Sequence, residues 1–339
     1  MRTSIVNPPK SWRDSSSHYK EALNSPWYNI ITKLQAEFVN ATVSFYRTKS
    51  YDFVLLPITT GSISSPMGLG SDSSPIKVNI QGIDTYLADS MQFMLEYACR
   101  VRKNGCYYLE PSFRGEKADA RHLCQFYHSE AEIEGSLDDV IKLVEDYVKY
   151  LAKWYLDNCK ELLLQVTENT NHIENLVKIK NIPRVSFDQA VDILENNKEF
   201  ITDHGKYRTI NSNGEKALMD KYNGFVWLTN FDHLSVPFYQ KSLDSKFKTA
   251  VNADLLMGIG ETVGSGMRHF SREETEKALE FHKVRKEDYQ WYLDMKEIVP
   301  MQTSGFGLGV ERFLLWLTNQ NDIRDMQLVP RFNGEKSVL

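Results

Sequence analysis

The chain has 339 residues, of which 42% are hydrophobic, and a formal net charge of −5. This length is enough for one large domain or two modest ones with a sizeable core, and the acidic balance gives no global basic field for DNA or RNA. No apolar run approaches the about 18 residues of a membrane span, and the first residues lack the apolar core of a secretion signal. The four cysteines form no CxxC pair, so neither a disulfide framework nor a zinc site is predicted. We therefore expect a cytoplasmic protein with reduced cysteines.

The N-terminal part predicts a long amphipathic helix followed by a short strand. Ser25 and Pro26 supply an N-cap and a first helical residue. Apolar residues then recur at steps of four and three, at Trp27, Ile31, Leu34, Phe38, Ala41 and Phe45. The run "DFVLLPI" is predicted as a strand that ends at Pro57. Residues 59–75, rich in Gly, Ser and Pro, predict a mobile loop that closes over an occupied site.

The rest of the chain alternates strand-like and helix-like segments. The strand-like runs are "IKVNI", "CYYLEPSF", "CQFYHSEAEI", "FVWLTNF" and "ADLLMGIGETV". Helices are predicted at 137–158, 187–196 and 310–318, the second with a capping box between Ser186 and Gln189. Because no repeat or linker divides the chain, we expect a 1–25 extension and one α+β domain over 26–339.

A row of polar residues follows two of these predicted strands. Residues two apart on a strand share a face. The first row is Ser112, Arg114 and Glu116, and the second is Phe126, His128, Glu130 and Glu132. A solvated sheet face with scattered salt bridges would explain both rows. A phenylalanine within a polar row favours a stacking platform instead.

A glycine-rich strand near the C-terminus offers a second candidate surface. In "SGFGLGVERF" the glycines stand at every second position, which removes side chains from one face and lets a flat ligand approach the backbone. Arg312 then enters the following helix with a planar guanidinium suited to stacking or phosphate contact. Close packing between sheet and helix would account for the same glycines.

These segments carry a resemblance to a known family. "SFRGEKADARHLCQFYHSEAE" resembles motif 2 of the class II aminoacyl-tRNA synthetases, and "GFGLGVERF" resembles their motif 3. "ADLLMGIGETVGSGMRH" and "LLWLTNQNDIRDMQLVPR" are similar to the aspartyl and asparaginyl subgroup. The long helix and the strand ending at Pro57 are similar to motif 1, which builds the dimer interface. The resemblance covers about residues 27–332, and implies a central antiparallel sheet flanked by helices and a homodimer in which the stripe from Trp27 to Phe38 pairs the subunits.

The resemblance implies ATP as a substrate. Adenine is expected between Phe126 and Arg312, against Gly307 and Gly309. Arg114 is expected to bridge the α-phosphate and the attacking carboxylate, because two anions approach only when a cation neutralises them.

The remaining residues matched to ATP surround the phosphates and the base. Glu116 is expected to accept a hydrogen bond from the adenine amino group. Arg121 and His122 are expected to touch the outer phosphates, although a solvated loop would also explain them. Asp254 and Glu261 are similar to the carboxylates that hold Mg²⁺, with an ordinary surface pair as the alternative. The resemblance therefore makes three residues catalytic: Arg114, Glu261 and Arg312.

Substrate choice depends on fewer residues. Gln92 matches the glutamine that faces the substrate α-amino group, and Arg268 matches the arginine that pairs with the substrate side-chain oxygen. Glu130 matches the residue that accepts from the amide in asparaginyl enzymes. Two positions depart from the family: Leu95 replaces a lysine of aspartyl enzymes, and "PMQTSGFG" lacks a histidine often found before motif 3. The sequence therefore leaves aspartate and asparagine as alternative substrates.

Only the segment 1–25 precedes the predicted motif 1 helix, too short for the five-stranded OB-fold that reads the anticodon in this subgroup. The chain thus resembles freestanding synthetase paralogues, including an archaeal type that makes asparagine from aspartate, ATP and ammonia, and tRNA is not expected as a partner. A second interpretation is transfer of aspartate or asparagine to a carrier protein, a small amine or tRNA. A third is an inactive regulator, against which the retention of Arg114, Glu116, Glu261 and Arg312 counts.

Overall fold

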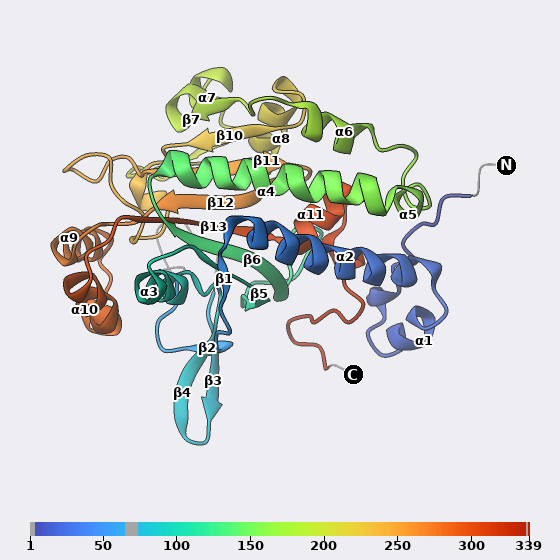
Figure 1. Ribbon diagram of the computed structural model, residues 1–339, viewed down its shortest axis with the longest axis horizontal. Coiled ribbons are helices and arrows are strands. Elements are labelled where there is room, and N and C mark those ends of the chain that lie inside the picture. The colour runs from blue at the N-terminus through green and yellow to red at the C-terminus, as the bar shows by residue number, and fades with distance from the viewer. Residues whose placement is uncertain (1–3, 65–73, 337) are drawn as a thin grey trace.

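The computed structural model describes residues 4–64, 74–336 and 338–339. Its centre is an eight-stranded sheet in the order β1-β5-β6-β13-β12-β11-β10-β7, antiparallel except for the edge pairs β1–β5 and β10–β7 (Figure 1). The strands are β1 (Asp52–Phe53), β5 (Cys106–Phe113), β6 (Gln125–Glu134), β7 (Arg184–Ser186), β10 (Val226–Thr229), β11 (Asn252–Met257), β12 (Gly260–Met267) and β13 (Thr303–Gly309). The predicted α+β class with a central antiparallel sheet is confirmed.

Helices α2 (Pro26–Lys49) and α4 (Leu137–Asn158) lie side by side over one face of this sheet (Figure 1). They form the main core together with α11 (Val310–Leu317). The rings of Phe38 and Phe313 are 5.7 Å apart, and the Tyr155 hydroxyl donates to the Leu34 carbonyl at 2.6 Å. The expectation that the stripe from Trp27 to Phe38 pairs two subunits is therefore wrong, because these side chains are fully buried inside one chain.

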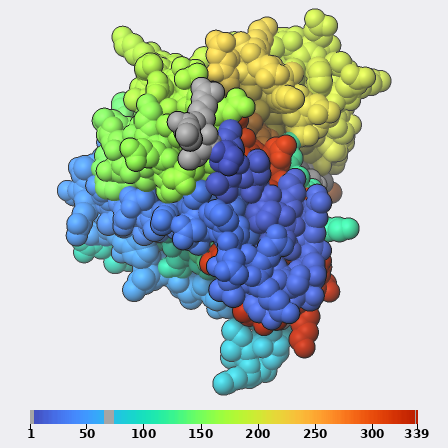
Figure 2. Space-filling view, turned by 90° about the vertical axis from the view of Figure 1, so that its right-hand side faces the viewer, coloured from blue at the N-terminus to red at the C-terminus, as the bar shows by residue number. Residues whose placement is uncertain are grey.

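The remaining elements surround the sheet. Two small sheets are formed by β2 (Thr59–Thr60), β3 (Ile76–Ile80) and β4 (Ile83–Leu87), and by β8 (Ile201–Asp203) and β9 (Arg208–Ile210). The other helices are α1 (His18–Ala22), α3 (Gln92–Arg102), α5 (Lys160–Leu163), α6 (Asn171–Lys178), α7 (Phe187–Ile193), α8 (Ser212–Lys221), α9 (Arg272–His282) and α10 (Gln290–Ile298), with 3-10 turns η1 (Ser11–Arg13), η2 (His233–Ser235), η3 (Lys286–Tyr289) and η4 (Ile323–Met326). The β3–β4 hairpin projects from the body (Figure 2). Among the described helices, none has the length and apolar character that crossing a membrane requires.

Several predicted elements are confirmed by their bounds. Helix α4 spans the predicted 137–158, and the Ser186–Gln189 capping box opens α7, which ends at Ile193 instead of residue 196. The β5–β6 hairpin pairs Ser112 with Phe126, so Ser112 shares a face with the second polar row, and Arg114 and Glu116 follow beyond the end of β5. The structure also places α3, α9 and α10, for which the sequence pattern gave no prediction.

Other expectations at the element level are wrong. "DFVLLPI" contributes only two residues to a strand, because this edge segment pairs with β5 alone and leaves Leu55 85% exposed. "ADLLMGIGETV" is two strands joined at Gly258, whose φ of 66° permits the turn. Ser25 is the N-cap residue and Pro26 opens α2, as predicted, although the Ser25 side chain makes no capping hydrogen bond. Of the predicted loop 59–75, Thr59–Thr60 form β2, and residues 65–73 lie outside the described part.

The N-terminal segment packs against the C-terminal part of the domain. The Trp12 indole donates to Asp325 at 2.6 Å, and the imidazole of His18 lies 2.8 Å from the Leu328 carbonyl oxygen. The guanidinium of Arg324 lies 3.9 Å from the centre of the Trp12 ring. The described residues before α2 are thus part of the folded body.

Candidate active site

The side chains predicted to bind ATP gather on the face of the sheet opposite α4. Alternate residues of β13 separate the two faces: Phe306 and Leu308 point into the core under α4, and the glycines point the other way. One cavity there is lined by all eight residues matched to ATP, namely Arg114, Glu116, Arg121, His122, Phe126, Gly307, Gly309 and Arg312. Glu261, which is matched to the metal, lines the same cavity.

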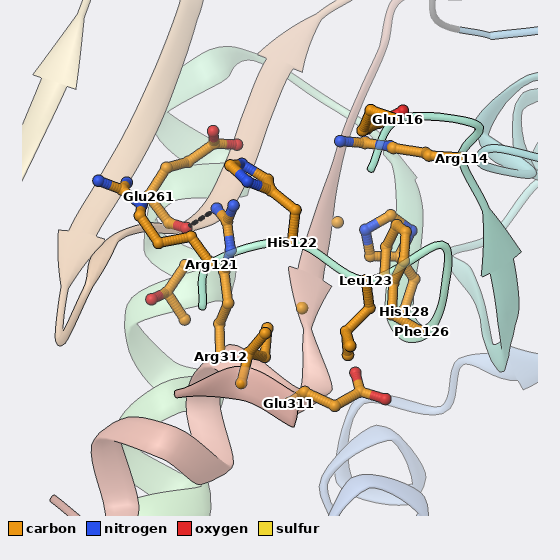
Figure 3. Close-up of a pocket in the computed structure, with 14 residues that line it drawn as sticks. Arg114, Glu116, Arg121, His122, Leu123, Phe126, His128, Glu261, Glu311 and Arg312 are labelled. Carbon is orange, nitrogen blue, oxygen red and sulfur yellow. Dashed lines mark hydrogen bonds between the residues drawn. The ribbon is translucent and has the colours of Figure 1, made fainter. Parts of the chain in front are cut away.

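The cavity has two opposed walls. Figure 3 shows Phe126 and Arg114 on one side and Arg121, Glu261 and Arg312 on the other. The Arg114 guanidinium carbon lies 5.3 Å from the centre of the Phe126 ring. The Arg312 guanidinium donates to the Glu261 carbonyl oxygen. A flat base can therefore enter between an aromatic face and a planar cation.

Two arginines in this cavity carry unsatisfied donors. Within the described part of the chain, the Nε atoms of Arg114 and Arg121 are buried and have no hydrogen-bond partner. Buried polar groups of native proteins are nearly always satisfied, so an orphaned pair at one site indicates a ligand with acceptor oxygens. Arg121 is otherwise held by Glu215 at 2.8 Å, and His122 Nδ1 lies 3.0 Å from Asp119.

Three carboxylates meet at the border of the cavity. A side chain at Gly264 would lie 2.8 Å from Glu261 Oε1 and 3.6 Å from Asp254 Oδ1, so both carboxylates converge above this glycine. Burial, then the charges of Glu261 and Glu215, raises the pKa of Asp254 well above its ordinary value. Burial also raises the pKa of Glu215, although Arg121 opposes it.

These carboxylates fit Mg²⁺ as part of its ligand shell, with the other ligands supplied from outside the protein. A cation would relieve the mutual repulsion of the carboxylates, and hard oxygens are the ligands that Mg²⁺ takes. Among the described residues, no group of three or more His, Cys, Asp or Glu side chains is arranged so that it could hold a metal ion by itself. Asp254 and Glu261 would therefore hold an ion that completes its shell with phosphate oxygens and water, and the ion would supply charge neutralisation to the phosphates.

A second, larger cavity of about 640 Å³ adjoins the first. Arg114, His128, Glu261 and Gly307 line both. All three residues matched to the amino-acid substrate, Gln92, Glu130 and Arg268, line the larger cavity. Asp254 lines it too. The structure thus brings every sequence-predicted site residue to one continuous hollow.

Arg268 has a partner that the sequence did not indicate. It is 2% exposed and forms two parallel contacts with Glu132, at 3.2 and 3.1 Å, and a third with Gln240 at 3.1 Å. Glu132 also accepts from the Gln92 amide. Arg268 is therefore already neutralised within the protein, and a substrate carboxylate would meet an ion pair and not a free cation.

The glycines of β13 make room for protein side chains as well as for a ligand. A side chain at Gly305 would lie 1.8 Å from Glu132 Oε2 and 2.3 Å from Gln92 Nε2. At Gly307 it would lie 3.0 Å from Glu130 Oε1, whereas at Gly309 it meets only Arg312 at 3.6 Å. The expectation that these glycines serve a ligand is thus incomplete, because Gly305 accommodates the Arg268–Glu132 pair.

Glu130 is held in place by its neighbours. It is 2% exposed and accepts from Ser90 Oγ at 2.7 Å and from the Met91 amide at 3.3 Å. Leu95 lies in an apolar cluster behind α3 and does not line the cavity. Glu130 and Arg268 therefore line this end of the larger cavity, and Glu132 lies behind Arg268 as its ion-pair partner.

Several cavity residues escaped the sequence analysis. Glu132 and His128 stand in the polar row of β6, but their roles depend on contacts with Arg268 and Ser112 that no sequence spacing specifies. Glu215 comes from α8, far along the chain from motif 2. A single carboxylate on a helix of mixed polar and apolar residues does not by itself indicate a functional site.

Comparison with known proteins identifies the family to which this chain belongs. Residues 17–333 match the model of the family "tRNA synthetases class II (D, K and N)". The chain belongs to this family.

Solved structures agree in fold. Asparaginyl-tRNA synthetase from Pyrococcus horikoshii, complexed with asparaginyl-adenylate, superposes with a TM-score of 0.84 at 25% identity, covering 93% of this chain and 71% of that one. Asparaginyl-tRNA synthetase from Entamoeba histolytica gives 0.81 at 22% identity, covering 97% and 73%. A putative aspartyl-tRNA synthetase from Leishmania major Friedlin gives 0.76 at 18% identity, covering 91% and 66%.

Proposed function

We propose that this chain is an AMP-forming ligase that activates aspartate with ATP and Mg²⁺ and transfers it to ammonia, giving asparagine without tRNA. The observation that carries the proposal is the continuity of the two cavities at Arg114. An arginine with an unsatisfied Nε at this junction can bridge the α-phosphate and a carboxylate that attacks it. The joint presence of Arg114, Glu116, Glu261 and Arg312 in one hollow argues against an inactive regulator.

The charges at the end of the larger cavity favour one orientation of the aspartate substrate. Arg268 and Glu130 line this end, and the Arg268 charge is already paired with Glu132 behind it, which leaves a net negative charge. An extra side-chain carboxylate there would face net negative charge, which is costly in a buried site. The α-ammonium and α-carboxylate of aspartate fit better, with the ammonium toward Glu130 and the carboxylate toward Arg268. The side-chain carboxylate then faces Arg114.

A second candidate follows from the same geometry. An asparagine side-chain amide presents an N–H group and an oxygen in nearly the positions of that ammonium and carboxylate, and the Pyrococcus enzyme was solved with asparaginyl-adenylate. In that orientation the α-carboxylate would be activated, and the acceptor would be tRNA or another amine.

Two measurements separate these candidates. Pyrophosphate exchange across a panel of amino acids should be supported by aspartate, and incubation with ATP and ammonium should yield asparagine and AMP. Exchange with asparagine alone would favour the second candidate. No exchange with any amino acid would mean that the chain is not an adenylating enzyme.

A further inference from the structure

One histidine occupies the junction of the two cavities. His128 lines both, and Figure 3 shows its ring beside that of Phe126. The two ring centres are 4.7 Å apart with planes at 89°, an edge-to-face contact that fixes the orientation of the imidazole. A side chain at this point can reach a group bound in either cavity.

The two ring nitrogens of His128 have different surroundings. Nδ1 lies 2.9 Å from Ser112 Oγ and 3.1 Å from Glu130 Oε1. Nε2 has no hydrogen-bond partner among the residues that the structure describes. A carboxylate beside Nδ1 favours the tautomer whose proton is on Nδ1, which leaves the Nε2 lone pair free, and it stabilises the imidazolium once Nε2 is protonated.

The charges that face this imidazole are mostly negative. They are Glu130 on its own strand, Glu110 opposite on β5, Glu311 on α11 and the cation Arg114 beyond the end of β5. Burial raises the pKa of Glu130, but the charge and hydrogen bond of His128 and the hydrogen bonds of Tyr108 and Ser90 lower it overall. Glu130 is therefore a carboxylate, the form that supports a base.

We infer that His128 is the base that deprotonates the nitrogen acceptor during transfer, an inference that depends on the proposed function. Ammonia attacks the carbonyl carbon of the acyl-adenylate and forms the new C–N bond. The tetrahedral adduct carries a positive nitrogen, and His128 Nε2 takes one proton from it. The C–O bond to the phosphate then breaks, and AMP leaves with the electron pair. The products are the amide, AMP and the imidazolium, which returns its proton to water.

The test compares two nitrogen acceptors in the variant His128→Asn. Hydroxylamine is a much weaker base than ammonia, so its adduct loses a proton to water without help. We expect amide formation from ammonia to fall at least about 100-fold, the usual contribution of a general base. Hydroxamate formation and pyrophosphate exchange should stay within a few-fold of the parent and also report correct folding.

The matched control is His122→Asn, which alters another histidine of the same cavity. It should raise the KM for ATP and leave the ratio of amide to hydroxamate unchanged. Equal losses with both acceptors in His128→Asn would overturn the inference, since the histidine would then position the adenylate. Unchanged amide formation in His128→Asn would overturn it too. Absence of pyrophosphate exchange, or of transfer to ammonia, in the unaltered protein would instead refute the proposed function itself.

Discussion

At the scale of single residues, the site depends on which charges are already paired. Arg114 forms no ion pair among the described residues and keeps an unsatisfied Nε, whereas Arg268 is neutralised by Glu132. Arg121 also keeps an unsatisfied Nε, but its charge is paired with Glu215, so Arg114 is the cation available to phosphates and carboxylates of a substrate. Arg268 instead forms a rigid polar wall with Glu132, and a change at Arg268 affects both stability and recognition.

Arg114→Ala should lower the rate of adenylate formation by orders of magnitude while the fold is retained. Its Nε has no partner among the described residues, so the substitution leaves no buried carboxylate unpaired. Removal of a cation that stabilises transition-state charge typically costs about 10²–10³ in rate. Pyrophosphate exchange measures the loss, and thermal unfolding checks the fold. Activity within a few-fold of the parent would show that motif 2 is misassigned.

Arg268→Lys should weaken amino-acid binding without affecting ATP. Lysine keeps a charge beside Glu132 but loses the two-pronged contact that positions it. We expect the KM for the amino acid to rise about tenfold or more, with the KM for ATP unchanged. Arg268→Leu is a poorer test, because an unpaired buried Glu132 costs about 3–5 kcal/mol of stability.

The matched control for this change is Arg208→Lys. Arg208 makes a similar fork onto Asp232, at 2.9 and 2.7 Å, and does not line either cavity. It should leave both KM values unchanged. A similar rise in both variants would indicate a general loss of stability and not a lost substrate contact.

At the scale of elements, β13 separates the core from the site by alternating glycines with apolar residues. Gly305→Ala should therefore be severe, since its methyl group would lie 1.8 Å from Glu132 Oε2 and 2.6 Å from the Ala131 carbonyl oxygen. We expect a large fall in amino-acid affinity together with lower stability. Gly309→Ala, with its nearest contact at 3.6 Å, should fold like the parent. Equal stability of the two variants in urea unfolding would contradict this account of the strand.

A buried histidine cluster ties η2 to α9 and predicts a pH dependence of stability. His233 Nδ1 lies 2.8 Å from His282 Nε2, and burial lowers their pKa values to about 4 and about 3. Below about pH 6.5 the unfolded chain binds more protons than the folded one, so the free energy of unfolding falls as pH falls. His233 alone accounts for about 2 kcal/mol between pH 7 and pH 5.

Urea unfolding at several pH values measures this slope. His282→Asn keeps a hydrogen-bonding group but removes one titrating ring, so the slope between pH 7 and pH 5 should become shallower. His204→Asn, at an exposed histidine, serves as the control and should keep the parent slope. A slope unchanged by His282→Asn would show that the cluster takes up protons without unfolding.

At the scale of the whole molecule, the exposed apolar surface near β1 is the place where a second subunit is expected. Leu55 is 85% exposed, and Phe53 and Ile58 are 43% and 45% exposed, beside the short edge strand. A homodimer through this surface remains a prediction. It replaces the expectation that the apolar stripe of α2 forms the interface, because that stripe is buried. Leu55→Glu should weaken the dimer by placing a charge in an apolar interface.

Light scattering at micromolar concentration measures this effect. The control Ile298→Glu changes a side chain of similar exposure (77%) at the end of α10 and should leave the mass unchanged. A parent protein that is monomeric at this concentration would contradict the prediction. Equal dissociation in both variants would move the interface elsewhere.

The sequence by itself determined the family, the fold class and part of the set of residues that line the two cavities. Motifs 2 and 3 are local patterns, in which strand alternation and glycine spacing predict which side chains share a face. Arg114, Phe126 and Arg312 could therefore be named from the sequence, and in the structure they line one cavity. Helix α4 was predicted with both bounds, and its apolar period is also a local signal.

Only the tertiary structure decided which of these residues are free and which are paired. The partners of Arg268 and Arg121 are Glu132 and Glu215, 136 and 94 residues away in the chain. No local pattern specifies such pairs, because they depend on how strands and helices pack in space. For the same reason the apolar stripe of α2 could not be assigned to core or interface, since burial is a property of the assembled fold and periodicity reports only that one face is apolar.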